Sequence, residues 1–168
     1  MGERIYGFPP VYAPDARILI LGSMPSVESL KQSFYYAHPR NTFWRIIPEI
    51  FGEKPVDTVE DKKSMLIRHG IALWDTVGSC EREGSLDSAI RGAEANDFDM
   101  LFSACPDIKH IFFNGAAAQQ LFVRMVGLDE TKYRYFRLPS TSPAYTLSYE
   151  KKLSVWKRVF EEVNYESL

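Results

Sequence analysis

Short apolar runs alternate with longer amphipathic stretches along most of the chain. Residues 16–21, 71–74, 108–113 and 133–138 are compact runs of aliphatic and aromatic side chains, a pattern typical of strands buried in a parallel sheet. The stretches between them have helical starts, stops or periodicity. This alternation predicts an α/β fold, a three-layer α/β/α sandwich with a mainly parallel four-stranded central sheet.

Five stretches carry the helical signals. Apolar side chains recur at helical spacing in 41–52 and 149–163, and 57–70 opens with a capping box and closes at a glycine. Shorter helices are predicted for 97–104 and 116–127. These helices are expected to cover both faces of the sheet.

One polar stretch, from Ser79 to Asn96, has no clear period. We interpret it as a long connection with room for a functional role. The chain shows no repeat, linker or low-complexity tract, and its 168 residues lie in the range of roughly 100 to 200 residues for one domain. Residues 1–168 are therefore predicted to form a single domain.

Composition places the chain among folded proteins. Hydrophobic residues make up 45% and aromatic residues 14%, which is too much for a disordered chain. Lys and Arg total 20 against 22 for Asp and Glu, a formal net charge of −2. The global charge therefore indicates no nucleic-acid partner, and any anion site must be local.

Cysteine and histidine usage excludes several cofactors. Cys80 and Cys105 stand far apart, which excludes a disulfide framework and a paired-thiolate cluster, and the three histidines lack metal-ligand spacing. We expect no metal and no cofactor. No segment approaches the ~20 apolar residues of a membrane span and the first residues lack a signal core, so a cytoplasmic protein without a membrane partner is expected. We further expect a monomer.

Four loops are candidate sites, because ligands of open α/β sheets bind at the carboxyl ends of the strands. These loops are 22–26, 75–79, 114–116 and 139–143. The first and the last combine small hydroxyl residues with prolines, and the backbone N–H and hydroxyl groups of such loops can hold phosphate oxygens. The alternative is that both are tight turns.

The distribution of charge favours phosphate binding. No acid lies between Glu28 and Glu49 or between Glu130 and Glu150, whereas each gap holds three basic residues. Both gaps flank a candidate phosphate loop. A polyanion could therefore bind there, since phosphate contacts provide most nucleic-acid affinity.

Aromatic residues gather in 34–44, beside the basic residues of the first of these gaps. Aromatic faces next to cationic groups suit the stacking of an extruded base. We interpret Trp44 as a core residue of the following helix and Phe43 as a stacking residue outside the core.

In order and composition these segments resemble the uracil-DNA glycosylase superfamily, in particular the mismatch-specific uracil and thymine glycosylases. Gly22-Ser23-Met24-Pro25-Ser26 and Ala37-His38-Pro39-Arg40-Asn41-Thr42-Phe43-Trp44 are similar to the family's first loop and helix start. Ile111-Phe112-Phe113-Asn114-Gly115 resembles its central strand and turn, and Leu138-Pro139-Ser140-Thr141-Ser142 its second phosphate-binding motif.

Two positions depart from the family pattern. Met24 stands where relatives carry a residue that positions the hydrolytic water, and Leu138 stands where uracil enzymes carry a histidine. The cysteines exclude the branches that hold a cluster. The first-loop and helix-start motifs, together with residues 73–75 and 79–87, are similar to those of the hypoxanthine branch, which removes deaminated adenine from DNA. The resemblance implies a DNA glycosylase whose partner is DNA containing deaminated bases. We expect it to be metal-independent, because the chain lacks metal-ligand spacing, and monofunctional, because the four candidate loops hold no lysine and strand cleavage needs an amine.

The resemblance also implies residue roles. Asn41 is the candidate catalytic residue, because its amide can orient the water or hydrogen-bond the leaving purine; alternatively, it only caps the helix. Phe43 is expected to stack on the base and Asn114 to read its edge, although Asn114 also fits an Asn-Gly turn. The base pocket is completed by Ser23, Met24 and Tyr36, and the phosphate-binding set consists of Gly22, Pro25, Ser26, Ser140, Thr141 and Ser142.

Two residues and two rival functions stay open at this level. Tyr145 is the candidate wedge that fills the space left in the duplex, and Asp75 is either a buried acid near the site or a helix cap, of which we favour the cap. The rival functions are a uracil or G/U(T) mismatch-specific glycosylase and a non-catalytic nucleotide- or phosphate-binding module. The chain lacks the P-loop and dinucleotide-binding motifs, which argues against nucleoside triphosphates and dinucleotides.

Overall fold

Four parallel strands form the central sheet of the computed structural model, which describes residues 3–166. The strands β2 (Ile18–Gly22), β3 (Ile71–Asp75), β6 (His110–Asn114) and β7 (Arg134–Leu138) lie in the order β3-β2-β6-β7. All residues of β2 and β3 are buried, as expected for strands with both faces covered. The predicted α/β class and four-stranded parallel sheet are confirmed.

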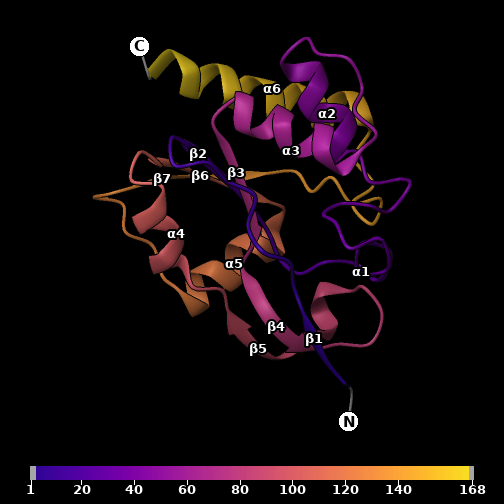
Figure 1. Cartoon of the computed structure of the whole chain (residues 1–168). Coiled ribbons are helices and arrows are strands. Elements are labelled where there is room, and N and C mark those ends of the chain that lie inside the picture. Colours follow the sequence, from indigo (N-terminus) through magenta and orange to yellow (C-terminus); the bar gives the residue numbers. More distant parts are fainter. Residues whose placement is uncertain (1–2, 167–168) are drawn as a thin grey trace.

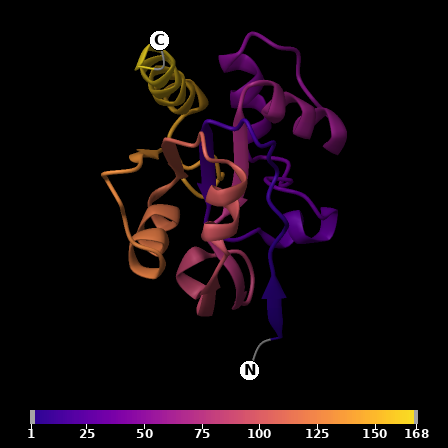
Figure 2. The same ribbon diagram turned by 60° about the vertical axis from the view of Figure 1, so that its left-hand side comes forward.

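Helices cover both faces of this sheet. Figure 1 shows α2, α3 and α6 on one side and α4 and α5 on the other, and the turned view of Figure 2 keeps this separation. The helices of the described chain are α1 (Val27–Gln32), α2 (Phe43–Ile50), α3 (Val59–Arg68), α4 (Phe98–Ala104), α5 (Ala116–Met125) and α6 (Tyr149–Glu166). The five predicted helices are all present, and the six-residue helix α1 is an addition.

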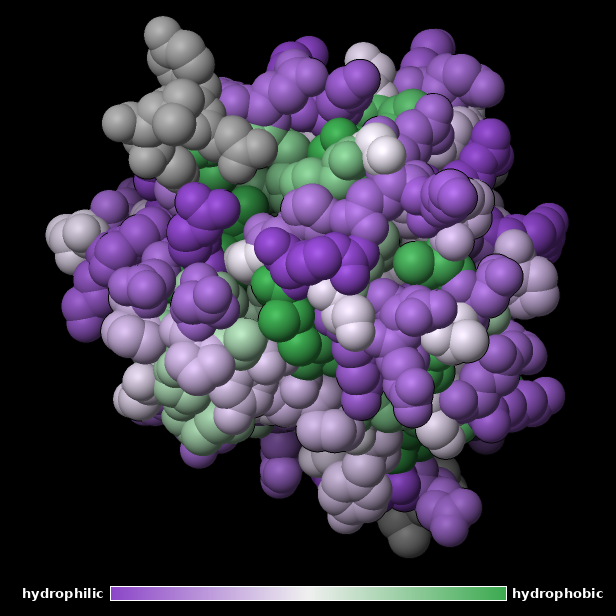
Figure 3. All heavy atoms as spheres, turned by 45° about the horizontal axis from the view of Figure 1, so that its top comes forward, coloured by the Kyte–Doolittle hydropathy of each residue, from purple (hydrophilic) through white to green (hydrophobic). Residues whose placement is uncertain are grey.

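The core lies between the sheet and these helices. Phe112 of β6 packs edge-on against Phe160 of α6, with ring centroids 5.0 Å apart. On the other face Phe113 packs against Phe122 of α5 at 5.4 Å. Successive residues of one strand thus fill the two opposite layers. The face of the molecule that carries α2, α3 and α6 is mostly hydrophilic, with several small apolar areas (Figure 3).

A second, antiparallel sheet corrects the interpretation of 79–96 as a connection. It consists of β1 (Arg4–Tyr6), β4 (Val77–Glu81) and β5 (Arg91–Ala95), in the order β1-β4-β5. A short 3₁₀ turn, η1 (Asp87–Ala89), lies between β4 and β5. Strand β5 is mostly exposed, so main-chain pairing rather than burial holds it, and its sequence therefore lacks a hydrophobic period.

Among the described residues, no helix is both long and apolar enough to cross a membrane. The same residues contain no group of three or more His, Cys, Asp or Glu side chains arranged to hold a metal ion. Cys80 and Cys105 are both buried and unpaired with each other.

Candidate active site

One pocket of about 440 Å³ lies at the carboxyl edge of the central sheet. This volume falls in the range of roughly 300 to 1,000 Å³ common for small-molecule sites. Its walls come from the ends of β2, β3 and β6, the loop after β7 and the segment before α2. The predicted site residues that line it are those of 22–26 and 140–142 together with Tyr36, Asn41 and Asn114. Phe43 and Tyr145 are not among its lining residues.

Asn41 reaches the pocket from the start of α2. The helix begins at Phe43 with Thr42 in the cap position, so the prediction that Asn41 is the N-cap is wrong by one residue. Its side chain still serves the helix start, because Oδ1 accepts a 3.0 Å hydrogen bond from the Phe43 N–H. This bond uses the oxygen, so the NH₂ group is the part of the amide that a ligand would meet.

Phe43 is a core residue, which corrects the expectation that it lies outside the core. Its side chain is 0% exposed and packs edge-on against Trp44 and Trp156, at centroid distances of 4.7 and 6.0 Å. The first turn of α2 directs the ring inward, toward α6. Tyr36 stacks on Phe43 at 4.4 Å and lines the pocket, so Tyr36 is the aromatic ring on the pocket side of this pair.

Tyr36 is held in an unusual way. Its φ angle is +53°, the left-handed region that residues other than glycine rarely adopt and that clusters at functional sites. Its hydroxyl is buried and makes no hydrogen bond of normal geometry among the described residues, although the Asn114 amide lies near enough to act on it. Burial, followed by the nearby Asp75 carboxyl, raises the pKa of Tyr36, so the phenol stays protonated.

Asp75 lies on the same side of the pocket as Tyr36. A Cβ atom on Gly22 would come within 2.4 Å of Asp75 Oδ1 and 2.8 Å of the Tyr36 hydroxyl. Both side chains therefore lie close over the end of β2, and only a glycine leaves room for them. Asp75 ends β3, and the next element is strand β4 rather than a helix. The favoured interpretation of Asp75 as a helix cap is therefore wrong.

The Asp75 carboxyl is 3% exposed and lines the pocket. Burial, with a further contribution from Asp87, raises its pKa to about 7, against an opposing effect of Arg82. Its Oδ2 atom is buried and has no hydrogen-bond partner within the described residues. A carboxyl group in this state exchanges between its charged and neutral forms near neutral pH.

Asn114 connects the end of β6 to the loop after β7. Its Nδ2 donates to Thr141 Oγ1 at 3.0 Å, and its Oδ1 accepts from the Thr141 N–H at 3.0 Å. The Thr141 carbonyl in turn accepts from the N–H of Thr42 at 3.1 Å and from its hydroxyl at 3.3 Å. The amide that was expected to read the base thus holds in place the loop of Ser140, Thr141 and Ser142, which we call the hydroxyl loop.

The hydroxyl loop has oxygens that already accept hydrogen bonds. Ser140 Oγ accepts from the Ser142 N–H at 3.1 Å, and Ser142 Oγ accepts from the Ala144 N–H at 3.2 Å. Each hydroxyl still has its own O–H to donate. Lys152 of α6 is nearly buried and donates to the Ser142 carbonyl at 3.0 Å. The loop is therefore rigid and presents donors, as phosphate binding requires.

The segment between β4 and β5 closes the other side of the pocket, and prediction from sequence gave its residues no role in the site. Ser85, Leu86 and Asp87 all line the pocket. Ser23 Oγ donates to Asp87 Oδ1 at 2.5 Å, and Ser85 Oγ accepts from the Val27 N–H at 2.8 Å. The signals for them were the polar, aperiodic character of the stretch and the similarity of 79–87 to the hypoxanthine branch.

Arg82 is a buried cation behind the first loop. Its side chain is 6% exposed, and one guanidinium nitrogen donates to the Pro25 carbonyl. Its Nε and Nη1 atoms have no partner within the described part of the chain. The positive charge lies near Asp75, since it opposes the rise in that carboxyl's pKa.

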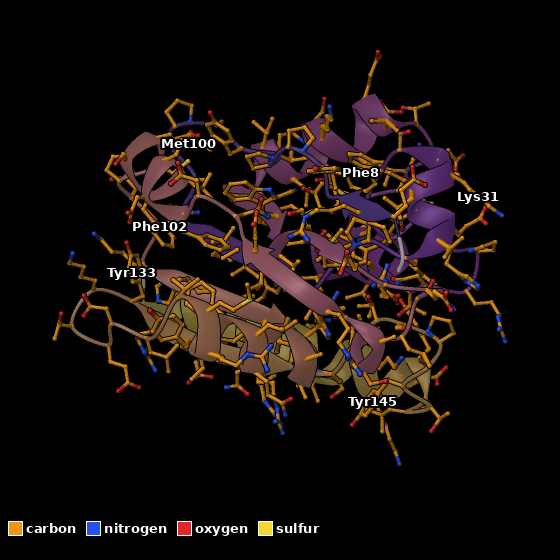
Figure 4. The ribbon with its side chains drawn as sticks, turned by 90° about the horizontal axis from the view of Figure 1, so that it is seen from below. Phe8, Lys31, Met100, Phe102, Tyr133 and Tyr145 are labelled. Carbon is orange, nitrogen blue, oxygen red and sulfur yellow. The ribbon has the colours of Figure 1, made fainter. Side chains whose placement is uncertain are left out.

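The predicted wedge residue and the basic residues differ in how close they lie to the pocket. Tyr145 is 49% exposed, follows the pocket-lining Pro143 and Ala144, and lies in Figure 4 away from Met100, Phe102 and Tyr133. The basic residues do not all reach the pocket. Arg40 lines it, but Lys132 precedes β7 at the opposite edge of the sheet and is paired with Asp129.

Residues 9–164 match the uracil DNA glycosylase superfamily, which is nearly the whole chain. The chain belongs to this superfamily, as the resemblance of its loops and helix starts predicted.

Two named relatives and one solved structure are similar to this chain over nearly its whole length. A hypoxanthine DNA glycosylase from Methanosarcina acetivorans is 40% identical over 156 residues, which cover 92% of this chain and 96% of that protein. A hypoxanthine DNA glycosylase from Methanosarcina barkeri is 36% identical over 158 residues, covering 92% and 97%. A solution NMR structure from M. acetivorans, described provisionally as a uracil DNA glycosylase, has a TM-score of 0.81 at 36% identity and covers 96% of this chain and 99% of that one.

Proposed function

We propose that this protein is a DNA glycosylase that removes hypoxanthine, the deamination product of adenine, from DNA and leaves an abasic site. The relatives named hypoxanthine DNA glycosylases, which match almost the full length of the chain, support the substrate. The observation that carries the proposal is the pocket itself. It brings the Asn41 amide, the Tyr36 ring and two hydroxyl-bearing loops to one edge of the sheet.

Hydrolysis of the N-glycosidic bond builds positive charge on the sugar while the base leaves with the bonding electrons. Catalysis then depends on stabilising charge and on placing a water, more than on a strong base. Met24 cannot hold a water, and its side chain packs against Val77, Cys80 and Leu121. In our proposal the Asn41 NH₂ group supplies the missing polar contact, to the water or to the departing purine.

The base binds in the interior of the pocket after it has been flipped out of the duplex. Tyr36 contacts its face, and Ser23, Met24 and Asn114 form the surrounding wall. Phe43 acts from behind, because it packs directly against the Tyr36 ring. Its proposed contribution is to fix the plane of the tyrosine.

The phosphates on either side of the flipped nucleotide bind to the two hydroxyl-bearing loops. One loop is 22–26, and the other consists of Ser140, Thr141 and Ser142. Tyr145, exposed beyond the second loop, is the proposed wedge. The protein acts as a monomer inside the cell, on DNA that contains deaminated bases.

A panel of single-lesion duplexes tests this function. Hypoxanthine, uracil opposite guanine, thymine opposite guanine and undamaged adenine are compared under single-turnover conditions, with base release detected as an alkali-labile site. Fastest release of hypoxanthine is expected. Faster release of uracil would instead identify a uracil or mismatch enzyme, and binding without release of any base would identify a non-catalytic module.

A further inference from the structure

Two buried polar atoms in the pocket make no hydrogen bond of normal geometry among the described residues. They are Asp75 Oδ2 and the Tyr36 hydroxyl, both fully enclosed, although the Asn114 amide lies near enough to the Tyr36 hydroxyl to act on it. Such orphaned groups are rare because each costs free energy unless something satisfies it. Both belong to side chains that line the pocket and lie close over Gly22. Their position indicates a ligand that supplies the missing hydrogen bonds.

Several other polar groups of the pocket already have partners. The Asn114 amide is bonded twice to Thr141, the Asn41 oxygen accepts from the Phe43 N–H, and the Ser23 hydroxyl donates to Asp87. Asp75 is thus the buried group best placed to contact the edge of a base.

We propose that Asp75 is a specificity-determining and catalytic residue that binds the extruded hypoxanthine as an uncharged carboxylic acid, donating its O–H to the base oxygen O6. This inference rests on the proposed function and assigns the edge contact that prediction from sequence gave to Asn114. In adenine the same position carries an amino group, which is itself a donor and cannot accept the hydrogen bond.

The surroundings of Asp75 favour the neutral form. The titratable and charged groups that act on it or on its neighbour come from three segments: Tyr35 and Tyr36 before α2, Arg82 after β4, and Asp87 in η1. Burial and Asp87 outweigh Arg82 and raise the pKa of Asp75 to about 7. Both tyrosines have a raised pKa and stay protonated. A base that gains negative charge beside Asp75 favours its neutral form still further.

A neutral acid suits the chemistry of the leaving group. As the bond to the sugar breaks, negative charge spreads over the purine to O6, and an O–H donor there binds more strongly in the transition state than in the ground state. An ionised carboxylate would repel the same charge. The acid form of Asp75 is therefore the active one, and the rate should fall as pH rises past the pKa of this group.

The test measures single-turnover release of hypoxanthine from duplex DNA between about pH 5.5 and 9. For the natural protein we expect a plateau at low pH and then a tenfold fall per pH unit. Asp75→Asn keeps an N–H donor that does not titrate, so its profile should lack this falling limb while hypoxanthine is still preferred over adenine. Asp75→Ala should slow release by ~100-fold or more on the plateau. Asp107→Asn, an equal charge change on an exposed residue ahead of β6, is the matched control.

Each outcome decides something. Release by Asp75→Ala within a few fold of the natural rate would overturn the proposal, as would a natural rate that rises with pH, which would mean that the carboxylate is the active form. The pH profile of the natural protein tests the proposal even if a variant does not fold. If the natural protein releases no hypoxanthine at any pH, the proposed function itself is wrong.

Discussion

Replacement of Asn41 separates a structural role from a catalytic one. The structure assigns its Oδ1 to the Phe43 N–H at the start of α2, and loss of such a bond costs about 0.5 to 2 kcal/mol. A domain of this size has about 5 to 15 kcal/mol of stability. At the unfavourable extreme, about 3 kcal/mol remains, which keeps more than roughly 99% of the protein folded since about 1.4 kcal/mol is tenfold.

A loss of activity much larger than a few per cent therefore cannot come from unfolding. If the Asn41 NH₂ group contacts the water or the departing purine, Asn41→Ala should lower single-turnover release of hypoxanthine by ~100-fold or more, the effect of removing one aligned donor. Asn41→Ser should do the same while keeping most of the stability, because a serine hydroxyl accepts the Phe43 N–H but is too short to replace the amide. Urea unfolding measures the stability of each variant, and release is measured at saturating protein.

A matched control is available at another helix start. Thr58 Oγ1 accepts from the Asp61 N–H at 3.0 Å at the start of α3, and Thr58 is not among the residues that line the pocket. Thr58→Ala should lose a comparable amount of stability and retain full activity. If Asn41→Ser is stable and as active as the natural protein, Asn41 is a structural residue only and the catalytic assignment is refuted.

Three further predictions concern the rest of the pocket. The double variant Ser140→Ala/Ser142→Ala should weaken duplex binding, in a fluorescence anisotropy titration, equally for damaged and undamaged DNA; an effect confined to one lesion would contradict phosphate binding. Gly22→Ala should destabilise the protein by about 1 to 3 kcal/mol in urea unfolding, because the new Cβ displaces Asp75 or Tyr36; an unchanged midpoint would show that these side chains are not held against β2. Borohydride trapping should give no covalent protein–DNA adduct, since no lysine of the described residues lines the pocket and strand cleavage needs an amine; a trapped lysine would show that the enzyme is not monofunctional.

The elements that bury apolar side chains were predictable from sequence. Strands β2, β3, β6 and β7 and the five longer helices each have a run or a period that follows from facing the core. Strands β1 and β5 have no such pattern. They are short and partly or mostly exposed, and their place depends on pairing with β4, a partner distant in the chain for β1.

The candidate site was predictable in its loops and less so in its side chains. Order along the chain placed 22–26 and 140–142 at one edge, because parallel strands end together. The sequence did not show which aromatic ring, Phe43 or Tyr36, lines the pocket, because it gives no signal for the left-handed backbone of Tyr36. Asp75 was misinterpreted because the charged residues near it, Arg82 and Asp87, lie in the polar segment after β4, which has no hydrophobic period.

Thr141 has a consequence for how affinity and rate are related. Its backbone carbonyl binds Thr42, next to Asn41, while its side chain and N–H bind Asn114. If DNA binds the hydroxyl loop as proposed, its binding should therefore also fix the position of the segment that carries Asn41. The affinity for undamaged DNA and the rate of base removal are then coupled. Substitutions that lower DNA affinity in order to speed product release should also displace the Asn41 amide from the reacting sugar. The effects of substitutions in the two segments on the rate should therefore not be additive.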